Sequence, residues 1–159
     1  MEKVIKELNW YYYGVMVFTL IILAVMYYVA SSEGYQPLDR YSTAGVTIQY
    51  VVIFWTLVTI PGGVYGFKYM CDKQITSTLK SPEDLTPAKL ELYTNLAIGR
   101  ILLVSSSMPL GIAAFYLFGG YRSMMWIAAI GAIGWYFTKP TIGKMQEELT
   151  PKDHNQENY

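Results

Sequence analysis

The stretch that decides the fold is Leu92–Phe118, which reads LYTNLAIGRILLVSSSMPLGIAAFYLF. It is long enough to cross a bilayer, because a helical crossing takes about 20 apolar residues. Its only charged residue is Arg100. A charge at membrane depth costs about 2.5–3.5 kcal/mol on insertion scales, so such a residue usually faces a bundle interior and has a partner there. The stretch therefore predicts a membrane-embedded helical bundle with one polar position inside it.

Three further segments extend this pattern along the chain. Apolar stretches without a charged residue cover 10–30 and 43–67, and a shorter one covers 123–138. Because these runs are continuous rather than alternating, they favour helices over a β-barrel. We expect an all-α polytopic membrane protein with a single domain over 1–149. It would form a four-transmembrane-helix bundle with spans at about 10–30, 43–67, 90–118 and 123–138.

The charged residues are sorted between the two ends of these spans, although the formal net charge is zero. In a four-span arrangement all nine lysines fall on one side, and the only basic residues on the other side are Arg40 and Arg122. The positive-inside rule then places both termini and the loop at 68–89 in the cytoplasm. We expect an integral protein of the inner (cytoplasmic) membrane of a bacterium.

The residue types that carry most chemistry are scarce. The single cysteine, Cys71, falls on the cytoplasmic side, and the single histidine, His154, falls in a polar tail at 150–159 that we expect to be disordered. The predicted spans hold no Asp or Glu except Glu91, which lies at the edge of the third span. Haem ligation by two histidines, a histidine-based zinc site and a carboxylate proton relay are therefore unsupported. We expect no catalytic residue, no metal, no cofactor and no nucleic-acid partner.

Two spans each carry a face of small and polar residues, which is the kind of surface through which helices pack in lipid. In the second span the seam residues are Gly45, Gln49, Val52, Thr56, Thr59, Gly63 and Gly66. In the third span they are Tyr93, Ala97, Arg100, Val104, Ser107, Gly111 and Ala114. Arg100 therefore lies on a face that we assign to the bundle interior.

The sequence Pro61-Gly62-Gly63 interrupts the second span near its cytoplasmic end. Proline removes a helical hydrogen bond and crowds the carbonyl four residues back, which is that of Leu57. We expect a kink or a short unwound turn, and favour it over the broken, ligand-lining helix of transporters. Counted from the cytoplasmic ends of the two spans, Arg100 lies level with Leu57 and Thr59.

Three interpretations of Arg100 stay open. Its side chain can snorkel to the cytoplasmic headgroups, hold the bundle together by donating to the carbonyls freed at Pro61, or bind an anionic ligand. The candidate structural or ligand site comprises Arg100, Leu57, Thr59, Pro61, Gly62, Gly63 and Ser107.

The end of the domain predicts a short amphipathic helix at about 140–149. Ile142, Met145 and Leu149 form its apolar stripe, which is typical of a helix lying in the membrane interface. Acidic residues on the cytoplasmic side are Asp72, Glu83, Asp84, Glu147 and Glu148. We interpret them as a solvated surface rather than a catalytic cluster.

Two function classes fit these features. The first is a non-catalytic accessory, assembly or scaffold subunit of an inner-membrane complex. It is favoured by the scarcity of catalytic and metal-ligating residue types and by the small-residue seams. The alternative is a protomer of a small homo-oligomeric transporter or channel, with Arg100 and the broken second helix near the solute path. The partners would be the lipid bilayer and either other membrane subunits or further copies of the chain.

The charge sorting predicts the sidedness of the loops. Cysteines placed one at a time at Ser77 and Gly120, in a chain without Cys71, should react with a membrane-impermeant thiol reagent from the cytoplasmic and the outer side respectively. The reverse labelling pattern would contradict the topology.

Overall fold

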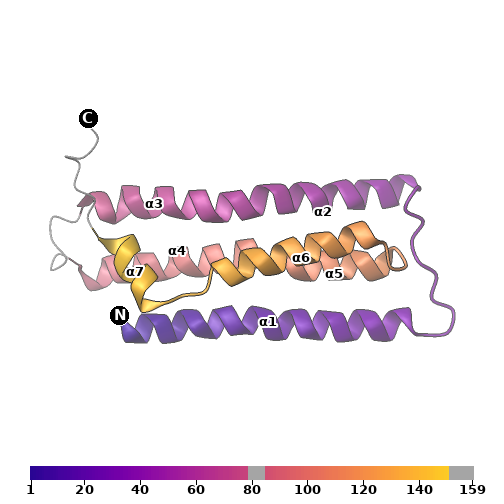
Figure 1. The fold of residues 1–159 in the computed structure, drawn as a ribbon, viewed down its shortest axis with the longest axis horizontal. Helices are drawn as coiled ribbons and strands as arrows, with labels where there is room; N and C mark the ends of the chain where they lie inside the picture. The colour runs from indigo at the N-terminus through magenta and orange to yellow at the C-terminus, as the bar shows by residue number, and fades with distance from the viewer. Residues whose placement is uncertain (79–84, 151–159) are drawn as a thin grey trace.

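The computed structural model describes residues 1–78 and 85–150, and every regular element in these ranges is helical (Figure 1). The tail at 151–159 lies outside the described residues. The elements are α1 (Glu2–Ala30), α2 (Thr43–Pro61), the π-helical turn η1 (Gly62–Gly66), α3 (Phe67–Gln74), the 3₁₀ turn η2 (Thr76–Thr78), α4 (Pro87–Ser105), α5 (Ser107–Leu117), α6 (Arg122–Phe137) and α7 (Ile142–Leu149).

Within the described residues, three continuous helical segments are long and apolar enough to cross a membrane by length and composition: Glu2–Ala30, Thr43–Gln74 and Pro87–Leu117. The fourth expected span corresponds to α6, which has 16 residues. This is shorter than the roughly 20 residues that a bilayer crossing needs. The all-helical class is confirmed, whereas a topology with four crossings stays a prediction.

The second long helix passes through its proline without breaking. Pro61 keeps helical dihedral angles (φ −62°, ψ −42°), and Gly62–Gly66 forms a π-helical turn that leads directly into α3. A wider turn is one way for a helix to accommodate a residue that lacks a backbone N–H donor. The glycines within the turn offer little steric resistance to this geometry. In place of a break, the chain forms this π-helical turn, and α2 and α3 continue in one direction (Figure 1).

The centre of the bundle is the hairpin of α5 and α6, which pack closely through glycine. A Cβ atom at Gly111 would overlap the backbone of Ala128, and one at Gly131 would lie 2.5 Å from the Met108 nitrogen. Ala114, on the same face of α5, is 3% exposed. Helix α1 packs on α4 and α5, while α2 packs on α4, α5 and α6. The small-residue seam of the third span is thus used inside the chain.

The loops at the far end of the bundle are tied to each other. Leu38 N donates to Leu117 O at 2.8 Å, and Tyr35 Oη donates to Tyr116 O at 2.7 Å. Gln49, a residue of the predicted seam of the second span, donates to the Arg40 carbonyl at 2.9 Å. At the opposite end, the N-terminus of α1, α3, the start of α4 and α7 lie together (Figure 1). This second end holds the candidate site.

The same substitution at two glycines should have different effects on stability. In Gly111→Ala the added methyl group meets Ala128, so the free energy of unfolding should fall by about 1–3 kcal/mol. Gly14 in α1 has nothing within 4 Å of such a methyl group, so Gly14→Ala should be neutral or stabilising by up to about 1 kcal/mol. Denaturation in mild detergent measures both. Equal responses would contradict the α5–α6 packing.

Candidate functional site

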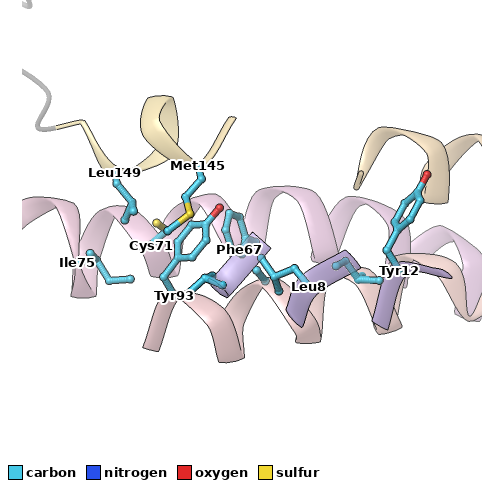
Figure 2. Close-up of a cluster of buried hydrophobic side chains, with 11 residues drawn as sticks. Leu8, Tyr12, Phe67, Cys71, Ile75, Tyr93, Met145 and Leu149 are labelled. Atoms are coloured by element: carbon cyan, nitrogen blue, oxygen red, sulfur yellow. The ribbon is translucent and has the colours of Figure 1, made fainter. Parts of the chain in front are cut away.

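The short helix α7 folds back over the end of the bundle and completes a buried cluster there. Met145 and Leu149, which are 0% and 5% exposed, point toward Cys71, Ile75 and Tyr93 (Figure 2). Ile142 stays 45% exposed. A helix is therefore present at Ile142–Leu149, and Met145 and Leu149 of its apolar stripe bury their side chains in protein, whereas its placement at the membrane interface stays a prediction.

The guanidinium of Arg100 on α4 is paired with the carboxylate of Glu148 on α7. Arg100 Nη1 lies 2.6 Å from Glu148 Oε1, and the two side chains are 12% and 26% exposed. The second carboxylate oxygen, Oε2, accepts a hydrogen bond of 2.6 Å from the Tyr93 hydroxyl. The guanidinium carbon lies 3.9 Å from the centre of the Phe67 ring, within the range of a cation–π contact.

The main chain of Glu148 is held as well. Its carbonyl oxygen accepts from the Cys71 thiol at 3.7 Å and from the Thr76 hydroxyl at 3.4 Å. One residue of α7 therefore contacts α3, η2 and α4. Because a thiol is a weak hydrogen-bond donor, these contacts matter more for positioning the main chain of Glu148 than for stabilising it.

The partner of Arg100 is a correction to the sequence-based hypothesis. One of the three interpretations had Arg100 donating to the main-chain carbonyls freed near Pro61, whereas the structure provides a carboxylate far along the chain. The second long helix and α4 do meet at the level of Arg100, but through Gly63, which packs on Val104. A Cβ atom added at Gly63 would lie 3.7 Å from the Arg100 carbonyl oxygen. Only the folding back of α7 brings Glu148 to Arg100, and no periodicity within one helix reveals that.

The other expected site residues do not gather around Arg100. Thr59 and Ser107 meet each other, with their hydroxyl oxygens 3.3 Å apart in a buried contact between α2 and α5. Leu57 is 67% exposed, and Pro61 and Gly62 are exposed too. The candidate site thus divides into a hydroxyl contact at the middle of the bundle and a charged cluster at its end.

The energetics of the charge pair depend on its partial burial. A buried pair can cost as much in desolvation as it gains in attraction, but removal of one partner leaves an uncompensated charge and is strongly destabilising. Here the carboxylate uses both oxygens, whereas the Nε atom of Arg100 is buried and has no hydrogen-bond partner. We assign Arg100 a structural role: it fixes α7 to the bundle.

Charged side chains surround a pocket of about 330 Å³ beside this pair. The interpretation of the acidic residues as solvated surface is wrong for Glu148, while Asp72 and Glu147 line the pocket and Glu83 and Asp84 lie outside the described residues. The sequence held one signal that could have identified Glu148: it flanks the stripe of Met145 and Leu149, so docking of that stripe carries it inward.

Across residues 1–78 and 85–150, no group of three or more His, Cys, Asp or Glu side chains is arranged to hold a metal ion. Comparisons with models of protein families, with curated proteins and with solved structures find no match to this chain.

Loss of both members of the charge pair should destabilise the fold by less than the sum of the two single losses. Arg100→Met alone should lower the free energy of unfolding by about 2–3 kcal/mol, somewhat below the range for a fully buried pair. Arg100→Lys should recover only part of this, because the planar guanidinium fork is lost. The double variant Arg100→Met/Glu148→Met should cost at least about 1 kcal/mol less than the sum of the single variants. Additive costs would show that the two side chains are not coupled.

The reactivity of the single cysteine reports on the docking of α7. Cys71 is 2% exposed beneath this helix, so a hydrophilic thiol reagent should label the native protein slowly. Glu148→Lys places like charges together and should raise the labelling rate about tenfold, which corresponds to about 1.4 kcal/mol of docking free energy. Glu147→Lys makes the same charge change at an exposed position of α7 and serves as the control. Equal acceleration by both variants would contradict the proposed role of Glu148.

Proposed function

We propose that this chain is an integral membrane protein with four crossing helices and cytoplasmic termini, and that it acts as a non-catalytic accessory or scaffold subunit of a membrane complex. One observation carries the proposal. Arg100, the ionisable side chain that the sequence places inside a span, is engaged by Glu148 and the Phe67 ring of the same chain. This polar side chain therefore joins helices of its own chain.

The arrangement of the lysines supports the orientation. The described lysines lie on the N-terminus of α1, on α3, at the start of α4, in the connection between α6 and α7, and on α7. These segments share one end of the bundle (Figure 1). In the proposed topology α6 crosses with its 16 residues, helped by its close packing on α5 and by the aromatic residues Trp135–Phe137 at its inner end.

Other features weigh against the transporter alternative. The second helix continues through Pro61 as a π-helical turn, so it is not the discontinuous helix whose separated ends coordinate solutes in transporters. The hydroxyls of Thr59 and Ser107, at the middle of the bundle, share a buried hydrogen bond of 3.3 Å. Neither group is left to line a solute path.

The test is the composition of the purified complex. A tagged chain should be recovered from its native membrane in mild detergent with a foreign membrane subunit at a fixed ratio, measured by intact mass. A homo-oligomer with a central axis, together with solute flux in reconstituted vesicles above that of empty vesicles, would favour the channel. Recovery of the chain alone as an inert monomer would contradict both functions.

A further inference from the structure

A pocket of about 540 Å³ opens at the end of the bundle opposite α7, where the connection from α1 reaches α2 (Figure 1). Arg40 is the only charged residue that lines it. It differs in this from the larger apolar groove of about 690 Å³ between α1 and the α5–α6 hairpin, whose lining residues carry no charge. The other residues of this Arg40 pocket supply hydroxyl, amide and apolar groups: Tyr41, Val46, Gln49, Tyr50, Ile53 and Tyr121.

The guanidinium of Arg40 contacts two tyrosine rings. Its central carbon lies 4.7 Å from the centre of the Tyr41 ring and 5.1 Å from the centre of the Tyr121 ring. Both distances are within the range of a cation–π contact. Arg40 Nη2 also donates to Tyr41 Oη at 2.8 Å. Because Tyr121 precedes α6 and Arg40 precedes α2, these contacts join two connections at this end of the bundle and fix the position of the cation.

The main chain that carries Arg40 is held against the first turns of α2. Gln49 Nε2 donates to the Arg40 carbonyl at 2.9 Å. The Ser42 hydroxyl accepts from the Gly45 nitrogen at 3.1 Å, and a Cβ atom at Gly45 would overlap the Asp39 carbonyl. The cation is therefore pre-organised, which lowers the ordering cost of binding a ligand.

The charge of Arg40 is not neutralised within the protein. Among the described residues no carboxylate forms an ion pair with it, and the neighbouring Asp39 carboxylate accepts instead from the Tyr41 nitrogen at 3.0 Å. A guanidinium has five N–H donors, so four remain beside the one that Tyr41 accepts. The Tyr41 hydroxyl, which accepts that bond, keeps its own proton to donate. Such a fork of donors fits two oxygens of a phosphate group.

We infer that the Arg40 pocket binds the phosphate of an anionic phospholipid, with an acyl chain lying along α2. Val46, Tyr50 and Ile53 follow each other at helical spacing and are 38%, 70% and 39% exposed, so they form an apolar strip below the cation. Ile53 lies ten residues after the start of α2 at Thr43, which is about 15 Å along the helix axis. The pocket therefore spans the distance from a headgroup to about the middle of a hydrocarbon core of about 30 Å.

The position along the chain suits a lipid headgroup. The segment Thr43–Gln74 is long and apolar enough to cross a membrane, and Arg40 lies three residues before it. Tyrosine side chains are enriched at the level of the headgroups, where their rings and hydroxyls meet different surroundings. The inference rests on the membrane embedding in the proposed function, and not on the presence of a partner subunit.

The single cation selects the class of headgroup. Phosphatidylglycerol carries one negative charge on its phosphodiester, which one guanidinium matches. Phosphatidylethanolamine adds an ammonium, and no residue that lines the pocket supplies a carboxylate for it. Inorganic phosphate would find the same donors, but it would leave the apolar strip without a ligand.

The experiment compares these three ligands on the full-length protein. The chain is purified in mild detergent and stripped of lipid, and then phosphatidylglycerol or phosphatidylethanolamine with the same acyl chains is added in equimolar amount. Retention of one lipid per chain, measured by intact mass, should be about tenfold better for phosphatidylglycerol, as expected for hydrogen bonds to an uncompensated charge. An excess of inorganic phosphate should not displace it.

Matched variants test the cation. Arg40→Gln should lower retention of phosphatidylglycerol about tenfold, and Arg40→Lys should recover only part of it, because the planar fork is lost. Arg122→Gln makes the same charge change at the same end of the bundle but outside the pocket, so it should alter retention by less than about twofold. The bond from Gln49 goes to the main chain of Arg40 and survives all substitutions there. Thermal unfolding without lipid shows whether each variant is folded.

A second pair of variants tests the apolar strip. Ile53→Asn should lower retention of phosphatidylglycerol about fivefold through lost apolar contact with the acyl chain. Val51→Asn places the same side chain at a similar depth of α2, at an exposed position outside the pocket, and should have little effect.

Four outcomes would overturn the inference. They are failure to retain phosphatidylglycerol, equal retention of the two lipids, displacement of the lipid by inorganic phosphate, and equal losses in the variants inside and outside the pocket. Displacement would indicate a site for small anions instead. None of these measurements depends on whether a foreign subunit is recovered with the chain, so failure here leaves the scaffold function standing.

Discussion

The pairing of Arg100 with Glu148 is the constraint on which the end of the bundle that holds α7 depends. A guanidinium eight residues inside an apolar segment is costly unless an opposite charge comes to it. Glu148 meets that need, and in doing so it carries Met145 and Leu149 into the core. The charge pair and the apolar cluster therefore stabilise each other: neither forms unless α7 is docked.

Elsewhere the bundle is held by close packing rather than by charge. Between helices in lipid there is little hydrophobic driving force, so the contact area must come from backbones that approach closely. Gly111 against Ala128 and Gly131 against Met108 provide that approach along the α5–α6 hairpin. The flanking helices α1 and α2 then pack on this hairpin and on α4. Between α1 and α6 the packing is incomplete, and the apolar groove is the result.

Much of the fold followed from local pattern. The apolar segments at 10–30, 43–67 and 90–118 became continuous helices, and Pro87 begins the third of them. Thr86 accepts a hydrogen bond from the Lys89 nitrogen, as a residue capping a helix does. The effect of Pro61 was predicted less well. Proline signals that a helical hydrogen bond is missing, but whether the chain kinks, unwinds or widens into a π-helical turn depends on what packs beside it, here Val104 against Gly63.

The sequence by itself determined the class of the molecule, because hydrophobicity and charge act through the solvent and need no knowledge of the neighbouring helices. It determined that apolar helices dominate, that the lysines gather at one side in a four-span arrangement, and that Arg100 faces the interior. Only the tertiary structure decided what Arg100 meets there. Its partner lies 48 residues away on a helix that reverses over the bundle, and such a contact depends on how separate helices pack rather than on the periodicity of any one of them.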